Sequence, residues 1–92
     1  MFPEIIKVFG LPFKIVEVEE MPPGERDCLG IMHLNTLTIR VLSTLTPELK
    51  EAVLCHELIE AMDTLCEMNL PHHKIEQLGN LMHQVLLQWR PS

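Results

Sequence analysis

The stretch Thr46-Pro-Glu-Leu-Lys-Glu-Ala-Val-Leu-Cys-His-Glu-Leu-Ile-Glu-Ala-Met-Asp63 decides the fold, because with it a strand-rich first half gives way to a helical second half. The Thr46 side chain can accept a hydrogen bond from an amide of the first helical turn, and a proline directly after it gives up an amide that would have no partner. Glu48 suits the positive end of the helix dipole. The pattern predicts a helix from Pro47 to about Asn69, broken by Leu70-Pro71.

Both predicted helices have one apolar side. On the first helix, this side is formed by Leu54, Leu58, Ala61 and Leu65, which we expect in the core. A second helix is predicted from His72 to Trp89 and is closed by Arg90-Pro91. Its apolar stripe consists of Ile75, Leu78, Met82, Val85 and Trp89.

The sequence before Thr44 indicates strands, because β-branched residues and turn-forming residues are concentrated in this part of the chain. The first predicted strand is Leu11–Glu19. It is followed by a polar loop with a Pro-Pro-Gly turn, Glu19–Asp27, and then by two further strands, Leu29–Leu34 and Thr36–Leu42. The last two strands are joined at Asn35, a residue that tolerates the left-handed conformation of a tight hairpin. In the third strand Leu37, Ile39 and Val41 share one face, as in a half-buried strand.

Strands followed by helices predict a single α+β domain over residues 1–92. We expect a small antiparallel sheet of about three strands, packed on the long helix and on the second, C-terminal helix. Hydrophobic residues make up 47% of the chain and charged residues 22%, which is a globular composition.

Charge and cysteine content limit the partners and the compartment. Thirteen acidic residues against seven basic ones give a net charge of -6, which argues against nucleic acid and against an anionic membrane as partners. Three cysteines without CxxC spacing argue against a disulfide framework. Glu4 and Lys7 lie where a signal peptide would need an apolar run, and no stretch approaches ~18 consecutive apolar residues. We therefore expect a cytoplasmic protein.

The chemically most informative motif is Cys55-His-Glu-Leu-Ile-Glu-Ala-Met-Asp63. His56 and Glu60 are one helical turn apart on the same face, so an imidazole and a carboxylate could bind one divalent metal ion. Glu57 points about a quarter-turn away, where it could hold a water molecule next to that ion. A polar stripe of this kind is also typical of a solvated helix face, so the motif allows both interpretations.

A third ligand would come from the start of the second helix. His72, His73 and Glu76 all compete for this role. Two histidines and one carboxylate leave an open fourth position, which is the catalytic arrangement of zinc, whereas two glutamates with one histidine form a weaker site. His33 and His83 are predicted to be satisfied or solvated residues without a ligand role. Cys55 and Cys66 lie on the apolar flank of the first helix and are predicted to be buried as small hydrophobic residues.

With these motifs the chain resembles the small zincin-like proteins of the ImmA/IrrE type, which are common in phages and mobile elements. The resemblance runs from Ile6 to about Leu87 and is carried by Leu29-Gly30, Thr38-Ile-Arg40, Leu45-Thr-Pro-Glu48, the motif at 55–63 and Leu70-Pro-His-His-Lys-Ile75. The peptidase pattern of that group is His-Glu-x-x-His, and this chain departs from it because position 60 is glutamate. A variant of the group combines His-Glu-x-x-Glu with a downstream histidine, and His72 matches that position.

The resemblance implies a minimal zinc metallopeptidase, a hydrolase that would lie in the host cytoplasm if phage-encoded. His56, Glu60 and His72 would hold zinc, and Glu57 would act as general base toward the attacking water. The edge strand of the hairpin would align a peptide or protein substrate. The alternative function is a catalytically inactive, phage-type interaction module whose acidic face binds and regulates a protein partner.

Overall fold

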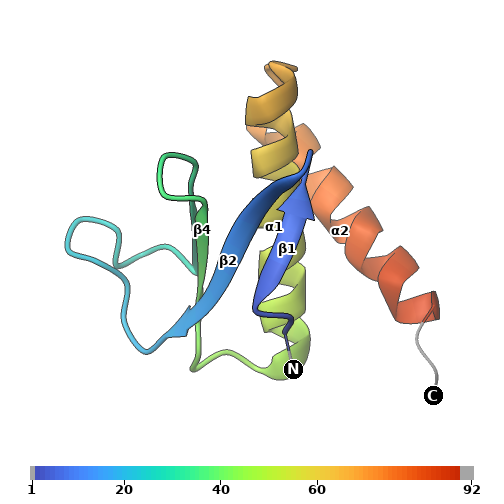
Figure 1. Cartoon of the computed structure of the whole chain (residues 1–92). Helices are drawn as coiled ribbons and strands as arrows, with labels where there is room; N and C mark the ends of the chain where they lie inside the picture. Colours follow the sequence, from blue (N-terminus) through green and yellow to red (C-terminus); the bar gives the residue numbers. More distant parts are fainter. Residues whose placement is uncertain (1, 90–92) are drawn as a thin grey trace.

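The chain begins with a β-hairpin. In the computed structural model, which describes residues 2–89, strand β1 (Ile5–Val8) pairs antiparallel with β2 (Leu11–Val18) around a Phe9-Gly10 turn (Figure 1). Both turn residues have positive φ, 52° and 75°, and glycine at the second position adopts this conformation without a steric penalty. The sequence predicts only the second of these strands, because four residues are too few to show an alternating pattern.

A second hairpin joins β3 (Gly30–His33) to β4 (Thr38–Leu42). Its loop is closed by a hydrogen bond from the Leu37 amide to the Leu34 carbonyl at 3.2 Å. Leu37 has the left-handed φ of 49°, so the prediction that Asn35 provides this conformation is wrong. In a four-residue loop built on a tight turn, the left-handed residue comes last, directly before the returning strand.

The two hairpins merge into one four-stranded mixed sheet with the order β1-β2-β4-β3. β2 and β4 run parallel, with Lys14 opposite Thr38 and Val18 opposite Leu42. The α+β class is therefore as predicted. The sheet has four strands instead of about three, and it is mixed instead of antiparallel because β2 and β4 run parallel. The loop that follows β2 carries the chain past the position of β4, so β3 becomes the edge strand and β4 returns beside β2.

Helix α1 (Pro47–Cys66) begins as predicted, with the Thr46 side chain accepting a hydrogen bond from the Leu49 amide at 3.3 Å. It ends three residues before the predicted boundary, because Glu67 adopts a left-handed φ of 53° and its amide bonds back to the Asp63 and Thr64 carbonyls. Helix α2 (His72–Trp89) has the predicted bounds. Neither helix combines the length and the apolar character that a membrane span requires.

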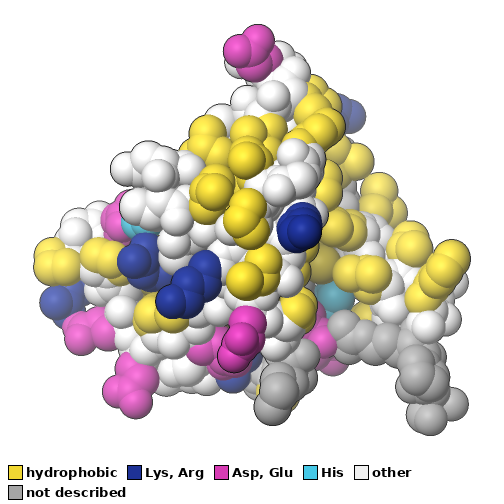
Figure 2. All heavy atoms as spheres, in the orientation of Figure 1, with side chains coloured by type: hydrophobic (Ala, Val, Ile, Leu, Met, Phe, Trp, Pro, Cys, Tyr) yellow, Lys and Arg dark blue, Asp and Glu magenta, His cyan; other side chains and the backbone are white. Residues whose placement is uncertain are grey.

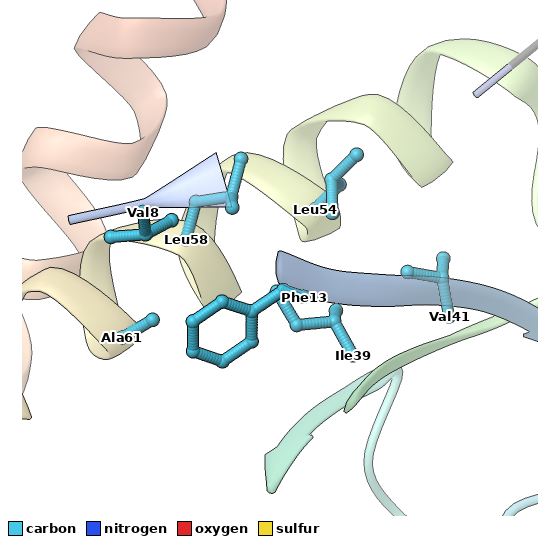
Figure 3. Packing of buried hydrophobic residues seen from close by; sticks show 7 residues of the cluster. All are labelled: Val8, Phe13, Ile39, Val41, Leu54, Leu58 and Ala61. Atoms are coloured by element: carbon cyan, nitrogen blue, oxygen red, sulfur yellow. The ribbon is translucent and has the colours of Figure 1, made fainter. Parts of the chain in front are cut away.

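The core lies between one face of the sheet and α1. Figure 3 shows its seven fully packed residues: Val8, Phe13, Ile39, Val41, Leu54, Leu58 and Ala61. Phe13, Ile39 and Val41 are fully enclosed, which matches the inward face predicted for the strand that contains Ile39 and Val41. Within residues 2–89, α2 packs against α1 and contacts no strand. One side of α2 is therefore left without a neighbour.

The face of α2 that packs on α1 differs from the predicted stripe. Its buried residues are Ile75, Gly79 and His83, whereas Leu78, Val85 and Trp89 are exposed. Gly79 explains the difference: a Cβ atom there would lie 3.0 Å from the Cα of His56, so the missing side chain lets the two backbones approach. The spacing of apolar residues in α2 correctly indicates an apolar stripe. The close contact of Gly79 with α1, however, fixes the rotation of α2 about its axis so that most of this stripe faces outward.

Candidate metal site

Three side chains that could bind a metal ion converge between the helices. His56 and Glu60 lie on α1 and His72 lies in the first turn of α2, and one ligand atom from each falls within 4.8 Å of the others. The Nε2 atom of His56 is 3.8 Å from Oε1 of Glu60. The two imidazole rings meet edge to face, with centroids 5.5 Å apart. The structure thus brings together the three residues that the sequence proposes as ligands.

The positions of these side chains follow from two backbone contacts. Gly79 sets the spacing between α1 and α2 at the level of His56. At the other end, the Leu70 amide donates to the Asp63 carboxylate at 2.9 Å, which ties the start of α2 to the last turns of α1. The short connection starts α2 beside the last turns of α1, and the rings of His72 and His56 meet in the space between the two helices.

The donor set fits a zinc ion. Bonds of 2.0–2.2 Å in tetrahedral geometry place ligand atoms about 3.3–3.6 Å apart, so a cluster within 4.8 Å needs only small side-chain rotations to close. Two imidazoles and one carboxylate leave the fourth position open for a substrate or a water molecule. His56 and Glu60 are half-buried, which limits competition from solvent.

The two competing third ligands lie differently. Glu76 lines the same cavity as His72, and its Oε1 is 2.9 Å from the His72 Nε2, so it can orient the imidazole as a hydrogen-bond partner. Its carboxylate is not part of the three-atom cluster. His72 and His73 are both exposed, but only His72 lines the cavity. The geometry therefore favours His72 as the third ligand, and the role itself stays a prediction.

Glu57 is the buried acid of the site, with only 5% of its surface exposed. Burial is the largest cause, and together with the negative charge of Glu60 and a hydrogen bond with the Glu60 carboxyl it raises the pKa of Glu57 from 4.5 to about 8. A hydrogen bond with the Met32 backbone partly opposes this rise in pKa. Glu57 is buried because β3 comes close to α1 at Gly30, where a Cβ atom would lie 3.2 Å from the Glu57 Cγ.

This raised pKa should make the metal-free protein less stable as pH rises. The unfolded chain releases the Glu57 proton near pH 4.5, whereas the folded chain keeps it up to about pH 8. The folded state therefore binds more protons within this window, and the free energy of unfolding falls across it by a few kcal/mol, at ~1.36 kcal/mol per pKa unit.

Glu57→Gln tests this effect, because the amide resembles the protonated acid in shape and carries no charge. In urea unfolding with a chelator present, wild type and variant should have similar stability at about pH 5. At about pH 8 the variant should be more stable by on the order of 3 kcal/mol. Equal losses of stability in the two proteins would contradict the burial of an ionisable Glu57.

A cavity of about 590 Å³ contains the cluster. His56, Glu57 and Glu60 line it together with polar side chains from α2, and apolar residues of α1 and of the loop before β3 line it as well. Among the apolar residues are Leu29 and Leu49. The buried acid and the three candidate ligands thus face one space that is large enough for part of a peptide.

The other candidates lie outside this space. His33 Nδ1 is 2.9 Å from an Arg40 guanidinium nitrogen, and His83 Nε2 is 3.5 Å from Oε1 of Glu51, so both histidines have polar partners, in line with their predicted structural roles. Cys55 is buried as expected. Cys66 is exposed, contrary to expectation, because the last turn of α1 extends beyond the sheet (Figure 1).

Comparisons with known proteins found no relative of this chain. No protein-family model, no curated protein and no solved structure matches it. The resemblance to zincin-like proteins accordingly stays a prediction from the motifs. What the site can do has to follow from its own side chains. These are two imidazoles and a carboxylate in one cluster, beside a buried second carboxyl group.

Proposed function

We propose that this protein is a minimal zincin-like zinc metalloprotein that hydrolyses peptide bonds. The observation that carries the proposal is the position of Glu57, buried in the same cavity wall as the cluster of His56, Glu60 and His72. A buried acid with a pKa of about 8 is suited to moving protons near neutral pH. A solvated polar stripe would not bury one of its carboxyl groups in this way.

In the proposed mechanism His56, Glu60 and His72 hold the metal ion. When bound, zinc would supply a positive charge that polarises a peptide carbonyl and lowers the pKa of Glu57 and of a nearby water molecule. Glu57 would then accept a proton from the attacking water and pass it to the nitrogen of the leaving amine. The hydrogen bond with the Met32 backbone would hold the Glu57 carboxyl in position during both transfers.

The proposed substrate is an extended peptide segment aligned along β3. This strand is the edge of the sheet and pairs with β4 alone among the described residues, so its other edge can add a strand. Gly30 at its start lines the cavity beside Glu57. A peptide paired there would pass next to the candidate ligands.

The proposal also agrees with the motifs that resemble the ImmA/IrrE type. Glu60 takes the place of the second histidine of the peptidase pattern, and His72 would supply the imidazole that this exchange removes. The ligand inventory of two imidazoles and one carboxylate is kept by this exchange, as is the ligand charge on zinc. A phage or mobile-element origin, with a regulatory protein as substrate, belongs to the same proposal.

Glu57→Gln separates catalysis from metal binding. We expect the zinc-loaded wild type to cleave an unfolded protein such as reduced, alkylated casein. The variant should keep its zinc and lose about 10²–10⁴-fold in kcat/KM, since an amide cannot accept the proton. Glu48→Gln is the matched control, because Glu48 is an exposed carboxylate in the first turn of the same helix.

Three results would count against the proposal. Cleavage that survives in Glu57→Gln would show that another enzyme or another residue is responsible. Stoichiometric zinc without any cleavage would favour the second candidate function, a non-catalytic module whose net charge of -6 suits a basic partner surface. Absence of zinc binding would remove the metalloprotein proposal altogether.

A further inference from the structure

An exposed apolar stripe runs along α2. Leu78, Leu81, Val85 and Trp89 are 41%, 56%, 52% and 83% exposed, and they recur at intervals of three or four residues. Figure 2 shows hydrophobic side chains along this outer side of the molecule, where α2 descends toward the C-terminus. No helix or strand of the described chain covers them. Large apolar side chains gathered on one face usually mark an interaction surface.

This stripe lies on the opposite side of α2 from the candidate metal site. His72, Glu76 and Asn80 line the cavity, and successive helical residues are about 100° apart, so the stripe is centred about half a turn around the helix from them. A peptide bound in the cavity would therefore leave the stripe uncovered. Whatever covers it binds independently of the proposed substrate.

The charge pattern of α2 is compatible with a second copy of this chain as the partner. From Gln77 to Trp89 the chain has no Asp, Glu, Lys or Arg, although it contains thirteen acidic and seven basic residues in all. A neutral surface on an acidic protein does not select a basic partner, but it allows two copies of net charge -6 to meet without placing like charges in contact. The stripe of one copy can therefore pack against the same stripe of a second copy.

The apolar area is also close to what a dimer needs. Side chains on and beside the stripe that are each at least 41% exposed offer apolar surface on the order of several hundred Å²; they are Leu78, Leu81, Val85, Leu86 and Trp89. A small stable interface buries about 600 Å² per partner, of which about 65% is apolar in homodimers, or roughly 390 Å². The exposed apolar area is therefore of the order that a small homodimer interface needs.

We propose that the protein forms a twofold-symmetric dimer through antiparallel pairing of α2. Lys74 lies on the same face as the stripe, one turn before Leu78, and a parallel pairing would bring the two Lys74 ammonium groups together. The antiparallel pairing separates them and lets the helix dipoles oppose each other. It places Leu81 against Val85 of the partner subunit and Leu78 against Trp89 of the partner subunit.

Sedimentation of the full chain over the micromolar concentration range, with a chelator present to exclude metal-bridged association, tests the dimer. The wild type should shift from monomer to dimer as concentration rises, and Val85→Glu should stay monomeric. Leu87→Glu is the matched control, because it makes the same change two residues further along, on the far side of the helix. It should dimerise like the wild type.

Mixing variants tests the direction of pairing. Leu81→Lys and Val85→Glu should each be impaired alone and should associate when mixed, because the antiparallel pairing joins the new lysine to the new glutamate. Recovery on mixing also shows that both variants are folded. A wild type that is monomeric at every concentration, or a Leu87→Glu variant impaired as strongly as Val85→Glu, would overturn the proposal.

Discussion

Replacing His56 with alanine should abolish tight zinc binding. His56 is the residue that contacts both other members of the cluster, through its Nε2 to Glu60 and through its ring to His72. Loss of an outer partner of a zinc ligand already costs about 10–100-fold in affinity, so loss of the ligand itself should cost more than ~100-fold. Competition of the purified, untagged protein against a chromogenic chelator measures this change.

The neighbouring histidines provide a matched pair for the third ligand. His72→Ala should weaken zinc binding about as strongly as His56→Ala, whereas His73→Ala should leave it almost unchanged, because His73 lies outside the cavity and outside the ligand cluster. Glu60→His should keep or tighten binding, since it restores the commoner ligand pattern. Unchanged zinc content in His56→Ala would refute the site, and a large loss in His73→Ala would refute the assignment of His72.

Zinc should also raise the thermal stability of the protein strongly. The ligands come from two helices, so an ion that binds them stabilises only the folded arrangement. At a free zinc concentration one hundred times the Kd the gain is about 2.7 kcal/mol. For a domain of this size this corresponds to a rise in Tm of roughly 10–20 °C, at ~4–8 °C per kcal/mol.

Thermal unfolding followed by circular dichroism, with zinc and with a chelator, measures this shift. The wild type and His73→Ala should both lose the zinc-dependent part of their Tm when the chelator is added. His56→Ala should melt at the same temperature under both conditions. A wild type that melts alike with and without zinc would leave the polar face of α1 as a solvated surface and would favour the interaction module.

The parts of the fold that the sequence predicts correctly depend on local chemistry. The start of α1 follows from the Thr46 cap and the proline beside it, and α2 has the bounds that its sequence indicates. The pairing of β2 with β4 depends instead on residues far apart in the chain, and neither strand carries a signal for a parallel neighbour. β1 escapes prediction because it is short and only half of its residues are shielded from solvent.

In the candidate site, too, the features that depend on local sequence are predicted and those that depend on distant contacts are not. His56 and Glu60 are found from helical spacing alone, because one turn always places them side by side. The approach of His72 depends on the helix contact at Gly79, a residue that sequence analysis does not single out. The burial of Glu57 depends in the same way on Gly30, where β3 meets α1. In both cases the absence of a glycine side chain allows the close contact between two elements. The spacing of apolar and polar residues along the sequence does not reveal such a contact.

The parallel pairing of β2 with β4 has a consequence for the order in which the protein folds. Each hairpin pairs strands that are neighbours in sequence, but joining the hairpins requires Lys14 to find Thr38 across a long loop, which is the slower kind of step. The candidate ligands span only His56 to His72 within one helical hairpin, whereas Gly30 reaches Glu57 from the sheet. We therefore expect the helical hairpin to form first, so that the three candidate ligands come together before Gly30 packs against Glu57.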